Sequence, residues 1–96
     1  MIALLLAAAV CHAPPALKAK AKIDCAAARK TALAKLGGKG LRVKSAELEE
    51  EGGKLVFSFD IARKGTPGVD EVQVDAKSGE VASVKHESPA DEAKEK

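Results

Sequence analysis

Aromatic side chains are almost missing from this chain of 96 residues, which contains Phe57 and Phe59 but no tryptophan and no tyrosine. Large apolar side chains supply much of the burial energy of a small domain, so their scarcity predicts a thin core and modest stability. Nucleic-acid bases stack on aromatic rings, and no ring stands among the basic residues of the N-terminal half. The composition therefore disfavours nucleic-acid binding.

Familiar catalytic signatures are also missing. The sequence has no glycine-rich phosphate loop, no cysteine and histidine cluster with metal-ligand spacing, and no nucleophile elbow. A nucleophile, a base and oxyanion donors do not occur in any recognisable arrangement. We therefore expect a protein that is not an enzyme and that uses no cofactor and no metal ion.

The first ten residues are all apolar, and they are too few to cross a membrane as a helix. Such a run is typical of the apolar core of a secretory signal. The small-x-small pattern of Ala19-Lys20-Ala21 predicts cleavage after Ala21. A second candidate site ends at Ala13, but Pro14 follows it and obstructs cleavage. We expect a secreted or periplasmic protein with no stable membrane span after the signal is removed.

Only two cysteines are present, Cys11 and Cys25, and cleavage after Ala21 would remove the first. Cys25 is then a candidate for a reactive thiol at a helix N-terminus, or for a disulfide with another chain. The alternative, which we favour, is a small apolar residue that packs a helix on a sheet. Lipid attachment at Cys11 is disfavoured, because bulky Val10 stands where a lipoprotein signal has a small residue.

A helix is predicted to begin after Asp24 as its N-cap and to end at Gly37-Gly38. Its many alanines favour helix formation. One arc of this helix is apolar and mostly small, which suits close packing on a sheet. The arc consists of Cys25, Ala28, Ala32, Leu33 and Leu36.

Alternating apolar and polar residues predict four strands after the helix. Their ranges are 41–50, 54–63, 69–75 and 80–86. Gly52-Gly53 suits a two-residue hairpin turn that places Leu48 opposite Phe57. The apolar residues before Lys44 are out of phase with those after it, which indicates either a bulge near Lys44 or a later start of the strand.

A turn at Pro67-Gly68 is predicted to separate this hairpin from a second one. The second hairpin turns at Lys77-Ser78-Gly79 and pairs Val74 with Ala82, which leaves Val81 on the outer face. The predicted fold class is α+β, with one N-terminal helix packed on an antiparallel sheet of two β-hairpins.

Three segments follow from these patterns. Residues 1–21 form a signal peptide and its cleavage region, residues 22–87 form one domain, and residues 88–96 form a disordered charged tail.

His86 lies opposite Asp70 in the predicted register, and a histidine in that position can act as a sensor of acidity. The favoured alternative is an ordinary solvated pair at a strand end. Asp75, with Ser78 and Gly79, resembles a loop site for a ligand. A simpler function for its carboxylate is to accept hydrogen bonds from the backbone of the turn.

Two groups of surface charge are candidate binding sites. Clustered carboxylates suit Ca²⁺, and the sequence contains Glu47, Glu49, Glu50 and Glu51. Spread positive charge suits anionic lipid headgroups or an acidic partner, and the sequence contains Arg29, Lys30, Lys35, Lys39, Arg42 and Lys44. For both groups we favour a solvated surface, because the acids lack a glycine-turned loop and the bases do not cluster.

The order of these elements resembles the PepSY domain, a family of secreted modules found in peptidase propeptides. The matching pieces are Ile23, Ala28, Ala32 and Leu33 in the opening helix, the alternating strand 55–61, and the segment 72–81, a valine-rich strand ending in Asp-Ala-x-x-Gly. Together they span residues 23–87. An acidic residue that the family often has in the first helical turn is replaced here by Cys25-Ala26-Ala27.

The resemblance implies a non-catalytic, exported module that binds a protein partner, such as a secreted peptidase that it restrains. It supplies no catalytic residue to transfer. The alternative function is a small periplasmic ligand- or cation-binding sensor.

Overall fold

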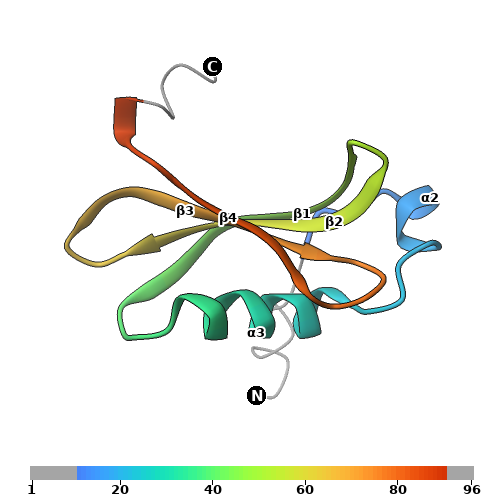
Figure 1. Ribbon diagram of the computed structural model, residues 1–96, viewed down its shortest axis with the longest axis horizontal. Helices are drawn as coiled ribbons and strands as arrows, with labels where there is room; N and C mark the ends of the chain where they lie inside the picture. Colours follow the sequence, from blue (N-terminus) through green and yellow to red (C-terminus); the bar gives the residue numbers. More distant parts are fainter. Residues whose placement is uncertain (1–10, 91–96) are drawn as a thin grey trace, which may run out of the picture.

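The computed structural model describes residues 11–90 and has an α+β fold, with one principal helix below a four-stranded antiparallel sheet (Figure 1). The elements in chain order are α2 (Pro15–Lys18), α3 (Cys25–Leu36), β1 (Leu41–Glu51), β2 (Lys54–Arg63), β3 (Thr66–Asp75) and β4 (Val81–Glu87). No helix in this part of the chain has the length and apolar character needed to cross a bilayer.

Helix α3 begins and ends where its sequence predicts. Asp24 is the N-cap, and its side chain accepts a hydrogen bond of 2.9 Å from the backbone amide of Ala27. At the other end, Gly37 has a φ of 67°. The guanidinium of Arg63, from the end of β2, donates to the carbonyl oxygens of Leu36 and Gly37 at 3.4 and 3.0 Å. A side chain of the sheet therefore satisfies the C-terminal carbonyls of the helix.

The sheet is a meander in which the strands lie in the order β1-β2-β3-β4. It is one continuous sheet rather than two separate hairpins, because β2 also pairs with β3. The predicted pairing of Leu48 with Phe57 is confirmed, and so is the bulge at Lys44, where the register shifts between Val43 and Ser45. The bulge brings the residues before it back onto the face that packs on α3.

Two predictions for the second half of the sheet are wrong. Pro67-Gly68 is not the turn between the hairpins, since β3 already begins at Thr66 after a tight turn at Lys64-Gly65. Val74 pairs with Val81 rather than with Ala82, because a bulge in β4 shifts the register there. The bulge moves Val81 to the core side, where it is partly buried.

The core lies between α3 and one face of the sheet. The fully buried residues of the helix are Ala28 and Ala32, and Cys25, Leu33 and Leu36 pack against the core while partly buried. The sheet supplies the bulk, and its largest fully buried side chains are Phe59, Ile61, Val72 and Val74. Small residues on the helix allow it to sit close to the sheet, so the helix contributes little volume to the core.

Residues 11–22, here named the strap, are folded against the domain, although all of them up to Ala21 fall in the predicted signal region. The strap contains α2 and forms a parallel bridge between His12 and Glu47 of β1. Its partly buried residues Cys11, Ala13, Leu17 and Ala21 pack against the core. The strap thus adds apolar side chains that cover a core with few large residues of its own. Most of the predicted tail, residues 91–96, lies outside the described part of the chain.

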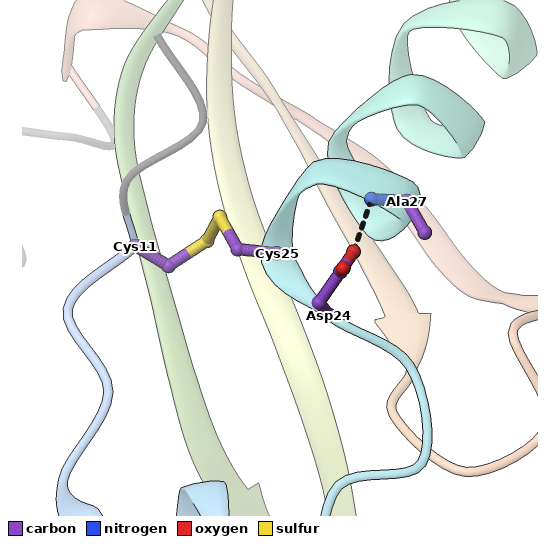
Figure 2. The surroundings of a disulfide bond; sticks show 4 residues. All are labelled: Cys11, Asp24, Cys25 and Ala27. Carbon is purple, nitrogen blue, oxygen red and sulfur yellow. Dashed lines mark hydrogen bonds between the residues drawn. A yellow bond between two sulfur atoms is a disulfide. The ribbon is translucent and has the colours of Figure 1, made fainter. Parts of the chain in front are cut away.

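A disulfide joins Cys11, at the start of the strap, to Cys25, the first residue of α3 (Figure 2). The two residues are separated by 14 positions, and their Cα atoms lie 5.9 Å apart. Closing a loop of this length stabilises a folded chain by roughly 3 kcal/mol in the chain-entropy description. For a small domain that is a large share of the total.

Substitution of Gly68 tests how closely the end of β4 approaches β3. Its φ is +85°, and a Cβ placed there would overlap the backbone carbonyl oxygen of Glu87 and lie 3.1 Å from the Cα of Ser88. We expect Gly68→Ala to destabilise the fold by about 3 kcal/mol, the sum of a backbone clash and a left-handed penalty. Gly65→Ala is the control, because Gly65 also has positive φ but nothing within 4 Å. It should cost only about 1 kcal/mol. Thermal melts followed by far-ultraviolet circular dichroism measure both, and equal losses would contradict the close approach.

Candidate interaction surfaces

The face of the sheet turned away from α3, here named the outer face, is polar and acidic. None of the described helices covers it (Figure 1). Val56 and Ser58 lie at its centre on β2 and are nevertheless only 2% and 7% exposed. The long side chains of the neighbouring strands must therefore close over them. The acidic residues of this face are Glu47, Glu49 and Glu51 on β1, Asp60 on β2, Glu71 and Asp75 on β3, and Glu87 on β4.

A chain of hydrogen bonds crosses the outer face and accounts for this cover. The amide nitrogen of Gln73 on β3 donates to a carboxylate oxygen of Glu51 on β1 at 2.8 Å. Because β2 lies between these strands, the bond passes above β2 near Val56. The hydroxyl of Ser83 on β4 donates to the amide oxygen of Gln73 at 3.0 Å. Side chains from three strands are thus connected in one polar layer.

Glu49 is the most perturbed carboxyl of the outer face. Partial burial is the largest cause, and the negative charge of Glu47 and a hydrogen bond with its carboxyl add to it, so the pKa of Glu49 rises from 4.5 to about 7. Glu51 and Glu71 contribute further repulsion. At neutral pH this group of acids therefore carries less charge than its composition implies.

Glu50 is separated from the other acids of β1. Glu50 points to the other side of the strand, where its carboxylate lies 3.6 Å from the ammonium group of Lys20 in the strap. Within residues 11–90, no three histidine, cysteine, aspartate or glutamate side chains are grouped so that they could hold a metal ion.

Asp75 accepts hydrogen bonds from the backbone amides of Lys77 and Ser78 at 2.8 and 2.9 Å. These bonds lower its pKa and give the carboxylate the predicted turn-capping contacts.

The two edges of the sheet differ. On the β1 edge, the amide of His12 donates to the carbonyl of Ala46 at 2.9 Å, and the amide of Leu48 donates to the carbonyl of His12 at 2.8 Å. The strap therefore occupies the middle of this edge as a short added strand. At the opposite edge lies β4, and the sheet has no further strand beyond it among the described residues.

Residues Val84 and His86 direct their backbone groups outward from β4. The amide of Asp75 donates to Glu80, so every second residue of β3, including Gln73, directs its backbone toward β4. The β4 partners of these residues, Ser83 and Lys85, direct their backbone groups inward. Val84 and His86 alternate with Ser83 and Lys85, so their backbone amide and carbonyl groups point away from the sheet. Val84 is also a large apolar residue with 43% of its surface exposed.

A pocket of about 610 Å³ lies where the strap meets the N-terminal end of α3. The disulfide forms part of its wall, and Leu48 and Phe57 reach it from the sheet. Lys18, Lys22 and Asp24 line it as well. Figure 2 shows the disulfide beside the N-cap of the helix, in front of the first two strands. The pocket is thus a product of the strap and would not exist without it.

Three sequence-predicted residues take definite positions here. Cys25 is bonded to Cys11, so neither cysteine is a free thiol in this fold. The expectation of a lone reactive thiol applies only to a chain cut after Ala21, and that cut remains a prediction. Nδ1 of His86 donates a hydrogen bond of 2.9 Å to a carboxylate oxygen of Asp70, which lies opposite it as predicted.

The strap itself was missed by reasoning from the sequence. The signal that reveals it is the presence of a second cysteine at a spacing that a helix N-terminus can close. The basic residues named as a candidate surface lie along α3, in the loop after it and at the start of β1. All of them are exposed except Arg29, which is half-buried. Its partial burial is consistent with a stem lying along the apolar surface.

Substitution of Glu49 tests the electrostatics of the outer face. A carboxyl whose pKa is raised in the folded state contributes stability that is complete below about pH 4.5 and is lost as the pH rises through about 7. Glu49→Gln imitates the protonated form, so it should stabilise the protein by about 1 kcal/mol near pH 8, after allowance for solvent screening, and have almost no effect near pH 4. Urea unfolding at both pH values measures this. Glu80→Gln, in the exposed β3–β4 turn, is the control and should show no such difference. An equal effect of Glu49→Gln at the two pH values would contradict the assignment.

Comparison with known proteins identifies the family. Residues 22–85, more than half of the chain, match the family model PepSY, described as the peptidase propeptide and YPEB domain. No curated protein and no solved structure matches the chain. The matched range contains α3 and all four strands except the end of β4. The chain therefore belongs to the PepSY family.

Proposed function

We propose that this protein is an exported, non-catalytic module that binds a secreted peptidase and restrains it. Membership of a family named for peptidase propeptides supports a protein partner of this class. The single observation that carries the proposal is the asymmetry of the sheet edges. The β1 edge is occupied by His12, whereas β4 offers outward backbone groups at Val84 and His86.

An extended segment of the partner adds to β4 as a fifth strand in this proposal. Strand addition obtains affinity from main-chain hydrogen bonds and specificity from alternate side chains. The exposed side chain of Val84 supplies an apolar contact in the middle of the edge. A peptidase suits this mode because peptidases bind their substrates in extended conformations. If the peptidase pairs with β4 through the segment that binds its substrate, β4 competes with the substrate for that segment. The outer face, with its carboxylates, then flanks the docked segment.

The first experiment measures inhibition. The purified full chain is titrated against secreted peptidases of the source organism while hydrolysis of a peptide substrate is followed. The proposal predicts saturable inhibition at sub-micromolar concentration, with the module intact afterwards. No inhibition of any secreted peptidase would remove this function from the protein.

Proline substitution tests the docking edge. Val84→Pro removes an outward amide without removing a bond to β3, so the fold should survive while inhibition falls at least tenfold. Val84→Thr keeps the amide and separates the loss of the side chain from the loss of the hydrogen bond. Glu50→Pro is the matched change on the other edge, because its amide shares the outward direction of Leu48. It should leave inhibition unchanged. Equal inhibition by Val84→Pro and the unmodified protein would exclude strand addition at β4.

A further inference from the structure

We propose that the exported protein keeps the strap as part of its mature fold, closed by the disulfide between Cys11 and Cys25. Any leader that is removed then ends before Cys11 rather than after Ala21. The proposal assigns both a processing position and an oxidative modification, and it rests on the exported nature of the proposed function.

The contacts of the strap are those of a structural element rather than of a discarded leader. At the start of the strap, the backbone of His12 forms two hydrogen bonds with β1. At its other end, the amides of Lys22 and Ile23 both donate to the carbonyl of Ala76, at 2.9 and 3.2 Å. Between these ends, Leu17 of α2 packs against the core. The segment is therefore attached at both ends and in its middle.

Cleavage after Ala21 would remove most of these contacts. It would free the carbonyl of Ala46 and the amide of Leu48 on the β1 edge. It would also uncover the apolar side chains of Leu48 and Phe57, which line the pocket beneath the strap. Such a chain would have two open sheet edges, a common cause of aggregation.

Formation of the disulfide between Cys11 and Cys25 requires an oxidant of the export compartment. The thiols of Cys11 and Cys25 lose two protons and two electrons as their sulfur–sulfur bond forms. A disulfide-containing oxidant, either an oxidoreductase or oxidised glutathione, accepts them by thiol–disulfide exchange and leaves as a dithiol or two thiols. Because the sulfur of Cys11 is then used, it cannot also carry a thioether-linked lipid.

A small-x-small pattern also occurs on the N-terminal side of the strap. Ala7-Ala8-Ala9 has the small-x-small pattern immediately before Val10 and Cys11. Cleavage after Ala9 would leave the strap and both cysteines in the mature chain.

Intact mass and N-terminal sequencing of the protein exported to a bacterial periplasm test the proposal. We expect an N-terminus at or before Cys11, a mass two hydrogens below that of the reduced chain, and a Cys11–Cys25 cross-linked peptide. An N-terminus at Lys22, a lipid on Cys11, or two alkylatable thiols would each overturn it. Ala19→Leu is a useful variant, because Ala19 is exposed and a large residue there blocks cleavage after Ala21. It should leave the mature N-terminus unchanged.

A second measurement does not depend on export. The purified full chain is refolded with oxidised or reduced glutathione and melted. The oxidised form should melt about 10 °C or more above the reduced form. Cys11→Ser should melt with the reduced form and be insensitive to reductant. Equal melting of the oxidised and reduced forms would contradict a structural role for the strap.

Discussion

The close contact between the alanine face of α3 and the sheet is the constraint on which the rest of the structure depends. Because Ala28 and Ala32 add almost no volume, the sheet must fill the core with its own large residues. Only two of these are aromatic, and Phe57 and Phe59 stack with their ring centroids 6.5 Å apart. The helix can approach the strands closely, but the resulting core is shallow and leaves the ends of the sheet partly uncovered.

The strap compensates for this shallow core at one end. Its apolar residues cover Leu48 and Phe57, and its disulfide restricts the unfolded chain as well as the folded one. Small exported domains commonly combine a limited core with a covalent link. The same segment also occupies the β1 edge, so a single element addresses both stability and unwanted strand pairing.

Much of this fold could be predicted from the sequence, for identifiable reasons. The helix limits follow from Asp24 and Gly37, since capping and left-handed φ are local properties. The β1–β2 register follows from the glycine turn and from the alternation of Leu48 and its neighbours, because a slip of one residue would invert both faces.

The remaining errors have physical causes. Val81 was out of phase in the same way as the residues before Lys44, yet it was not interpreted as the sign of a second bulge. For the candidate site, the pair of Asp70 and His86 was anticipated, whereas the bond between Glu51 and Gln73 was not. That bond joins strands that are not neighbours, and a pattern along the chain carries no information about such distances. The contacts of the strap with β1 and with Cys25 were not anticipated for the same reason, because they join segments that are not adjacent along the chain.

Both ends of α3 are attached to other elements by side chains, at Cys25 by a covalent bond and at Leu36 and Gly37 by the guanidinium of Arg63. An alanine surface has shallow ridges, so by itself it would define poorly how far the helix slides along the strands or rolls on them. The two attachments lie at opposite ends of the helix axis and fix both movements. The position of the helix on the sheet is therefore set by the attachments at its two ends together with the packing along its length.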